Sequence, residues 1–388
     1  MGFTTPDKPV DVAALFPELA ELARTAVRLH PREGTTTAHE SSLGGPLLWP
    51  AEEPWPVCTI DHDDPRPLTS AEGRVLEVRK NALHDEMNAL VGVGTQGDMA
   101  PFYRELDKVQ ASIREVRRVE FADDPAASLP MVAIAQFYAR DIPELPFPEG
   151  TDVCQVLWCP VDHEPHYAPR PQVWWRDSST VKALATALEP DEDSEPGCLP
   201  RACRIAPERV VEFPDSDELA SAELRDRIAE WEQGQKWRYG PHLSAAPGTK
   251  VGGWGYWIQD IAQPECSEGH RMDLLLTVAS AEHGDVGVWM AQETAAELEF
   301  QREVRFTLTN GSTGNTWIGK DEEFDAAGFS LFGHGVAPGS VTVSEELVPV
   351  TNSAPRGMDL MLGDVGNLYL FVCPTCPDRP TAVEFQCY

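Results

Sequence analysis

The sequence has no long apolar run and few basic residues for its acidic content. No stretch approaches the roughly 20 apolar residues that a helix needs to cross a bilayer. Lysine and arginine number 31 against 63 aspartate and glutamate, which gives a formal net charge of −32. This charge repels phosphate backbones and anionic membranes and attracts basic proteins. We therefore expect no nucleic acid and no membrane as partners, and a basic protein as the partner. The simpler alternative is that the acidity only keeps the protein soluble.

Targeting signals and familiar catalytic motifs are also lacking. The start, MGFTTPDKPVDVAALF, has no basic segment followed by an apolar one, and Pro6 stands where a myristoylation signal has Ser or Thr. We expect a cytoplasmic protein. No glycine-rich stretch is followed by the lysine of a phosphate-binding loop or continues as a dinucleotide motif. The nearest approach to a catalytic grouping, His39-Glu40 before Ser41-Ser42, is more typical of a polar loop.

The nine cysteines form an odd set, and most lie a few residues from another Cys or His. This pattern favours reduced thiols, some of them bound to zinc, over a secreted disulfide framework. Cys198 and Cys203 have no counterpart elsewhere in the chain, so we interpret them as ordinary thiols.

Two stretches of the sequence have the same spacing of Gly, Cys and His. They are GGPLLWPAEEPWPVCTIDH at 44–62 and GGWGYWIQDIAQPECSEGH at 252–270. In each, a cysteine lies 14 residues after the first glycine, and a histidine follows four residues later. The next Cys-Pro comes 101 residues after that cysteine in the first copy and 107 in the second. Such self-similarity predicts an internal duplication.

Each copy offers four candidate metal ligands in two short-spaced pairs. Structural zinc takes four Cys or His ligands in a tetrahedron, commonly as two such pairs. The competing interpretation is that these are ordinary core cysteines. His166 could replace His163 in the first set. The two predicted zinc sets are Cys58, His62, Cys159 and His163 in the N-terminal half, and Cys266, His270, Cys373 and Cys376 in the C-terminal half.

The glycine pairs Gly44-Gly45 and Gly252-Gly253 are interpreted as backbone devices, because glycine permits positive φ or close chain approach. Nearby tryptophans could line a binding face, but aromatic residues beside strands are more typical of a core. These tryptophans are Trp55, Trp174, Trp175, Trp254 and Trp257.

Length and patterning predict an α+β, β-rich fold in two tandem pseudo-repeats of a mainly antiparallel β domain with peripheral helices. At 388 residues the chain is long for one core and sufficient for two. The predicted divisions are an N-terminal repeat at 1–189, an acidic, proline-rich linker at 190–215, and a C-terminal repeat with the zinc knuckle at 216–388.

Apolar periodicity locates the expected elements. Helical spacing predicts helices at 10–29, at 74–121 as two helices broken near 92–94, and at 218–235. Apolar β-prone runs predict strands at 131–141, 152–162, 172–176, 272–280, 303–308 and 340–343, with a final hairpin over 363–388.

Several of these motifs resemble the YwqG-like family of bacterial proteins. They are SSLGG at 41–45, AQFY at 135–138, LPFPE at 145–149, TKVGG at 249–253, WIQ at 257–259 and GDVGNLYLFVC at 363–373. The resemblance implies a duplicated, β-rich domain. It also implies an interaction role, which in this family includes immunity-type partners of toxins.

The C-terminal half is also similar to the C-terminal domain of the programmed-cell-death-2 type proteins. The first cysteine pair of that domain appears here as Cys266 with His270, and imidazole can replace a thiolate at zinc. These relatives resemble dedicated chaperones of a basic ribosomal protein. The matching positions are Gly252, Gly253, Trp254, Trp257, Gln259, Cys266, Tyr369, Phe371 and Cys373.

The sequence thus predicts a zinc-stabilised cytoplasmic protein-binding module, chaperone-like or immunity-like, for a basic partner. The alternative is a metal-dependent hydrolase that uses the N-terminal site. There, water would occupy an open position on the metal, and Asp61, Asp162 or Glu164 would act as the base.

Overall fold

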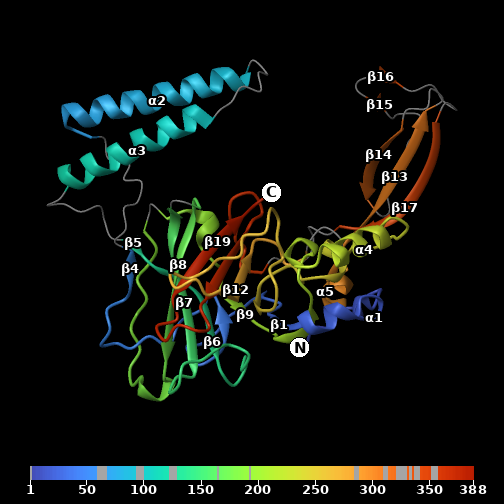
Figure 1. Ribbon diagram of the computed structural model, residues 1–388, viewed down its shortest axis with the longest axis horizontal. Coiled ribbons are helices and arrows are strands. Elements are labelled where there is room, and N and C mark those ends of the chain that lie inside the picture. The colour runs from blue at the N-terminus through green and yellow to red at the C-terminus, as the bar shows by residue number, and fades with distance from the viewer. Residues whose placement is uncertain are drawn as a thin grey trace.

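Two six-stranded antiparallel sheets form the centre of the protein in this computed structural model (Figure 1). The structure describes residues 2–58, 68–92, 100–121, 129–163, 166–191, 194–283, 288–308, 313–319, 330–331, 334–335, 341–350 and 357–388. The sheets and the surrounding helices confirm the predicted α+β class with antiparallel strands.

One sheet, called here the N-terminal sheet, consists in spatial order of β2 (Arg32–Glu33), β9 (Cys203–Arg204), β3 (Ser42–Leu43), β6 (Val132–Tyr138), β7 (Val153–His163) and β8 (Ala168–Arg176). The other, called the C-terminal sheet, consists of β10 (Glu208–Glu212), β1 (Arg24–Arg28), β11 (Lys250–Gly252), β12 (Asp273–Ala279), β18 (Asn367–Val372) and β19 (Thr381–Gln386).

The two sheets exchange strands. β1, from the start of the chain, lies between β10 and β11 in the C-terminal sheet, whereas β9 lies between β2 and β3 in the N-terminal sheet. The 190–215 segment therefore supplies one strand to each sheet, β9 and β10. Because of these crossed strands, the two sheets share one folding unit.

The prediction of a helix over 10–29 is wrong. The segment forms α1 (Val12–Leu15), a 3-10 helix η1 (Pro17–Leu22) and then strand β1. Pro17 disfavours the α conformation of the residue before it, and Phe16 lies outside the helical region at φ −128° and ψ 83°. Beyond it, pairing with β10 and β11 buries Ala26 and Val27 completely. Tertiary pairing thus overrides the helical spacing.

The main core lies between the facing sheets. Side chains alternate along a strand, so Val156 and Trp158 of β7 join this core together with Leu370 and Val372 of β18. Each buried side chain of this size contributes about 1.5–3 kcal/mol. The alternate residues of the same strands point to the outer faces, where two smaller clusters form around cysteines.

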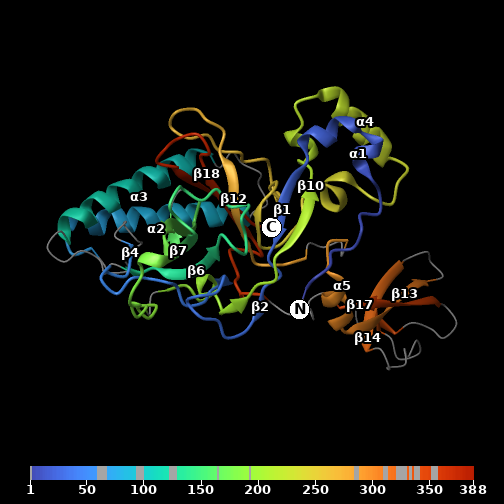
Figure 2. The same ribbon diagram turned by 90° about the horizontal axis from the view of Figure 1, so that it is seen from below.

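Helices and small sheets surround this pair of sheets (Figures 1 and 2). α2 (Ala71–Gly92) and α3 (Ala100–Glu120) form an antiparallel hairpin with its own apolar seam of Leu83, Leu106, Val109 and Ile113. This confirms the two predicted helices. A three-stranded sheet of β13 (Phe300–Leu308), β14 (Thr313–Gly319) and β17 (Val341–Pro349) lies at the other end of the molecule in Figure 1.

The remaining elements are short. Ser221 caps α4 (Ala222–Glu232) by accepting from the Leu224 N–H, which confirms the helix predicted over 218–235 with tighter bounds. The others are α5 (Gln292–Glu297), β4 (Val57–Cys58), β5 (Leu129–Pro130), β15 (Ser330–Leu331), β16 (His334–Gly335), η2 (Ser178–Thr180), η3 (Pro196–Cys198), η4 (Ser216–Glu218) and the π-helical turn η5 (Tyr239–Leu243).

A buried carboxylate organises the chain just after β11. Glu212 of β10 is completely buried and accepts from Lys250 Nζ at 2.7 Å and from the Trp254 N–H at 2.8 Å. Gly252 and Gly253 connect these two donors, at φ +65° and +73°. A Cβ on Gly253 would lie 2.3 Å from Glu212 Oε2, whereas one on Gly252 would meet only a carbonyl oxygen at 3.6 Å. The second glycine is therefore required for close approach as well as for φ.

The two neighbouring glycines give a matched test. We expect Gly252→Ala to cost about 1 kcal/mol, the strain of a left-handed backbone. We expect Gly253→Ala to cost about 1–3 kcal/mol more, because its methyl group displaces Glu212 from its buried partners. Urea unfolding of both variants measures the difference. Equal destabilisation would show that contact with Glu212 does not matter.

Candidate metal centres

The first pair of C-terminal ligands stands on a tight loop between β11 and β12. The Cys266 N–H donates to the His270 carbonyl at 2.9 Å, and the Gly269 N–H donates to the Cys266 carbonyl at 2.8 Å. Gly269 adopts φ +76°, which glycine tolerates. These backbone bonds bring the two ligands of the pair to the same side of the loop.

The second pair stands on the turn between β18 and β19. Cys373 follows directly after β18, and the Cys376 N–H donates to its sulfur at 3.4 Å. The turn closes through the Cys373 N–H to the Pro380 carbonyl at 2.9 Å and the Arg379 N–H to the Cys376 carbonyl at 3.0 Å. The final hairpin, which the sequence predicts, thus presents both sulfurs toward the 266–270 loop.

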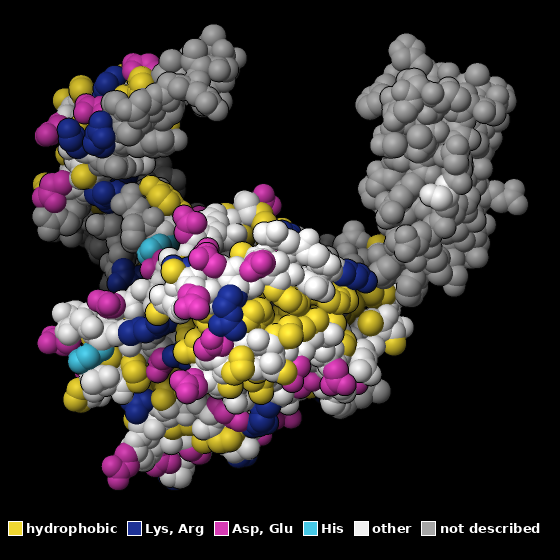
Figure 3. Space-filling model, turned by 45° about the vertical axis from the view of Figure 1, so that its right-hand side comes forward, with side chains coloured by type: hydrophobic (Ala, Val, Ile, Leu, Met, Phe, Trp, Pro, Cys, Tyr) yellow, Lys and Arg dark blue, Asp and Glu magenta, His cyan; other side chains and the backbone are white. Residues whose placement is uncertain are grey.

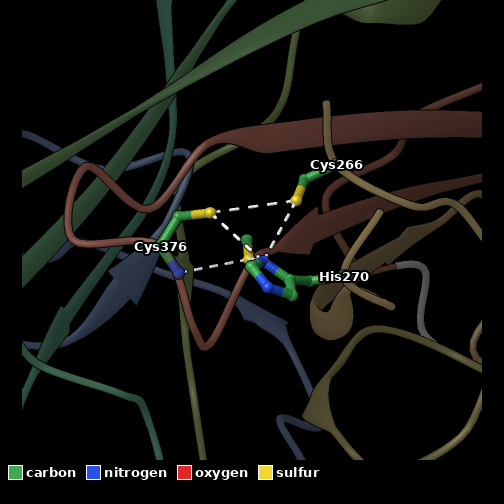
Figure 4. A group of neighbouring side chains, drawn as sticks. Cys266, His270 and Cys376 are labelled. Carbon is green, nitrogen blue, oxygen red and sulfur yellow. Dashed lines mark hydrogen bonds between the residues drawn. The ribbon is translucent and has the colours of Figure 1, made fainter. Parts of the chain in front are cut away.

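The four donor atoms meet at tetrahedral spacing (Figure 4). All lie within 4.8 Å of one another, and the sulfurs of Cys266 and Cys376 are 3.8 Å apart. His270 Nδ1 lies 3.6 Å, 3.8 Å and 3.4 Å from the sulfurs of Cys266, Cys373 and Cys376. A tetrahedral zinc with ordinary bond lengths has S···S edges of about 3.8 Å and S···N edges of about 3.6 Å. The site can therefore hold a metal ion with little movement.

The electrostatics of this cluster also favour a cation. Cys373 is fully buried and Cys376 is 9% exposed, whereas Cys266 and His270 are half-buried. Desolvation and the two neighbouring thiols raise the pKa of Cys376 to about 12. Desolvation acts against ionisation of Cys373, but hydrogen bonds from the N–H groups of Cys376 and Thr375 and from the thiols of Cys376 and Cys266 together lower its pKa. Three thiols this close cannot all ionise by themselves, and a divalent cation removes that obstacle.

In the N-terminal half, three of the four predicted ligands come together. Cys58 of β4 and Cys159 and His163 of β7 have donor atoms within 4.8 Å of one another. The sulfur of Cys58 lies 3.8 Å from His163 Nε2. The pairing of β7 with β8 shifts register between Cys159 and His163, so the strand is irregular between these two ligands. All three side chains are buried.

The structure does not add a fourth ligand from the other candidates of this half among the described residues. His62, Asp61 and Glu164 lie outside the described residues. His166 does not replace His163, because its Nδ1 lies 3.8 Å from Glu384 Oε2 on β19. Interaction with the Cys58 thiol, together with burial, raises the pKa of Cys159.

A third group joins Asp162, Glu195 and Cys198, whose donor atoms also lie within 4.8 Å of one another. Desolvation and the charge of Glu195 raise the pKa of Asp162 to about 6, and burial raises that of Cys198 to about 12. Sequence reasoning missed this group because its members show no metal-like spacing. Cys203 is buried in β9, consistent with an ordinary thiol.

The residues of the glycine motif brace the C-terminal cluster. Trp257 packs against Tyr369 and Phe371 at ring distances of 4.8 Å and 6.3 Å, beside the ligand cysteines. The Gln259 N–H donates to Gln386 of β19 at 3.0 Å. Trp254 is buried, and its indole N–H donates to the Leu22 carbonyl at 3.0 Å.

The tryptophans of the N-terminal half pack together in the same way. Trp49, Trp55 and Trp174 surround one another beside Cys58 and Cys159. Trp175, on the opposite side of β8, packs against the main core with Phe147. These side chains serve as packing groups, as the spacing beside strands predicts.

A comparison with protein-family models and one with curated proteins found no match. Among the described residues, no helix is long and apolar enough to cross a membrane. The function must therefore be argued from the chemistry of the sites.

Ligand replacement tests the C-terminal centre. We expect Cys376→Ala to lose one bound metal equivalent per chain, because three ligands hold an ion much more weakly than four. Cys387→Ala is the control, since that thiol is half-buried and outside the cluster. Elemental analysis by mass spectrometry reports the stoichiometry. An unchanged metal content in Cys376→Ala would remove this residue from the centre.

Proposed function

We propose that this protein is a zinc-stabilised binding module for a basic protein, of a chaperone-like or immunity-like kind. The observation that carries the proposal is the four-donor cluster of Cys266, His270, Cys373 and Cys376 at tetrahedral spacing. Four protein ligands leave no position for a substrate or for water, which is the arrangement of structural zinc. Its task would be to tie the 266–270 loop to the final hairpin.

The charge of the chain supports a basic partner. A net charge of −32 creates a long-range attraction that raises the rate of encounter with a cationic protein. On the face drawn in Figure 3, acidic side chains are spread among apolar and basic ones and do not form one patch. Attraction would thus be general, and specificity would come from local contacts. The resemblance to chaperones of a basic ribosomal protein agrees with this proposal.

We further propose that the two sheets descend from one duplicated unit, as two tandem pseudo-repeats. Their registers support this. Leu43 of β3 pairs with Ala135 and Val251 of β11 pairs with Leu276, and the first glycine of each pair, Gly44 or Gly252, comes next. Both central strand pairs contain a register shift at the equivalent place, between Ala133 and Ala135 and between Leu274 and Leu276. A ligand cysteine, Cys159 or Cys373, then comes one residue beyond the paired Trp158 or Val372.

The alternative, a metal-dependent hydrolase, has one observation in its favour. The N-terminal cluster has three described donors, so a tetrahedral ion there would have one position without a described protein ligand. Burial of all three donors argues against access by a substrate. Cobalt substitution separates the two functions. Tetrahedral spectra that do not respond to added anions favour the binding module, and an exchangeable water ligand favours the hydrolase.

Capture of partners from native lysate tests the proposed function directly. We expect basic proteins to bind the immobilised protein and to be released as salt rises, because screening weakens the attraction. Beads that carry polyglutamate are the control for simple ion exchange. The proposal fails if mass spectrometry finds no basic protein enriched above those beads.

A further inference from the structure

A groove separates the outermost strands of the two sheets. β8 ends the N-terminal sheet and β19 ends the C-terminal sheet, and the two strands lie side by side in the middle of Figure 1. The groove between them has a volume of about 660 Å³, within the range of small-molecule sites. It runs past His163 of the N-terminal cluster on one wall and the turn after Cys376 on the other.

Two arginines line opposite walls of this groove without a carboxylate partner. Arg170 stands on β8, and Arg379 stands on the turn before β19. No described carboxylate lies within salt-bridge distance of either side chain, and Arg379 donates instead to the Pro146 carbonyl. Several arginines elsewhere form ion pairs, as Arg176 does with Glu53 and Arg209 with Glu144. In a chain this rich in acid, two unpaired guanidinium groups in one groove indicate an anionic ligand.

The acidic groups near the groove do not neutralise it. Glu384 Oε2 lies 3.8 Å from His166 Nδ1. Burial raises the pKa of Glu384, and the interaction with His166 opposes this rise. Asp378 is exposed at the rim. The guanidinium groups thus remain available to a ligand.

The remaining walls are apolar and unsuited to an added peptide strand. Val173, Trp175 and Val383 supply apolar surface. Pro169 and Pro171 alternate along β8, and proline cannot donate to a strand ladder. Their nitrogen atoms must therefore face away from β7, toward the open edge where an incoming strand would need N–H donors. Side chains, and not backbone pairing, must hold the ligand.

We propose that this groove binds a small ligand with an oxyanion group, held by Arg170 and Arg379, and an apolar body that lies against the apolar part of its wall. Phosphate and carboxylate each offer two oxygens to which one guanidinium group can donate two parallel hydrogen bonds. Arg379 has φ +46°, and its N–H donates to the Cys376 carbonyl, so the zinc knuckle positions this arginine. This ligand site does not depend on the proposed binding of a basic protein and would be a second function of the chain.

Calorimetry with the full-length, metal-loaded protein tests this site. The probes are phenyl phosphate, benzoate and the neutral benzyl alcohol. We expect at least one of the two anions to bind with a dissociation constant below about 1 mM, and Arg170→Gln to weaken it about tenfold. Arg74→Gln, an exposed arginine on α2, is the matched control and should leave binding unchanged. Circular dichroism checks that both variants fold.

Each outcome decides a point. If only phenyl phosphate binds, the ligand carries a phosphate group. If only benzoate binds, the ligand carries a carboxylate. If both bind, the groove is a general oxyanion site. The proposal is overturned if neither anion binds, if benzyl alcohol binds as tightly, or if the two glutamine variants weaken binding equally.

Discussion

The convergence of three sulfurs and one imidazole nitrogen is the constraint on which the C-terminal half depends. The chain brings Cys266 and Cys373 together from positions 107 residues apart, into a partly dry site. Once ionised, thiolates this close repel one another. A bound cation would replace this repulsion with attraction, and that attraction contributes to the free energy of metal binding. The backbone bonds of both turns hold the donors at the edges of a tetrahedron. Binding of a metal ion at this site would therefore be linked to folding.

The glycine motif extends this constraint into the sheet. Gly253 leaves room for Glu212, which joins β10 to Lys250 of β11 inside the protein. The following residues place Trp257 on Tyr369 and Gln259 on β19, next to the ligand cysteines. A buried charge pair at one end of the motif and the candidate metal site at the other thus hold the same short segment. Removing one partner of such a pair leaves a buried charge uncompensated, which is costly.

The sequence predicts the ligands better than it predicts the topology. Cysteine and histidine spacing is local, so both halves of the C-terminal cluster could be identified from short pairs. The final hairpin and the α2–α3 pair also follow from local apolar patterns. The position of β1 could not be predicted, because Arg28 pairs with Glu208 and Lys250, about 180 and 222 residues away. Pairing at that distance also explains why residues 24–28 form a strand despite helical spacing. Asp162, Glu195 and Cys198 likewise meet only through folding.

The two clusters differ in exposure. Each lies on the outer face of its sheet, where it leaves the shared apolar core undisturbed. Cys58, Cys159 and His163 are all buried, while Cys266 and His270 are half-exposed. A metal ion at the first site would exchange slowly with solvent, whereas one at the second could exchange through its open side. A change in metal supply would thus act first on the C-terminal centre. Its effect would extend to the final hairpin, to Arg379 on the turn of that hairpin, and to the groove between the sheets.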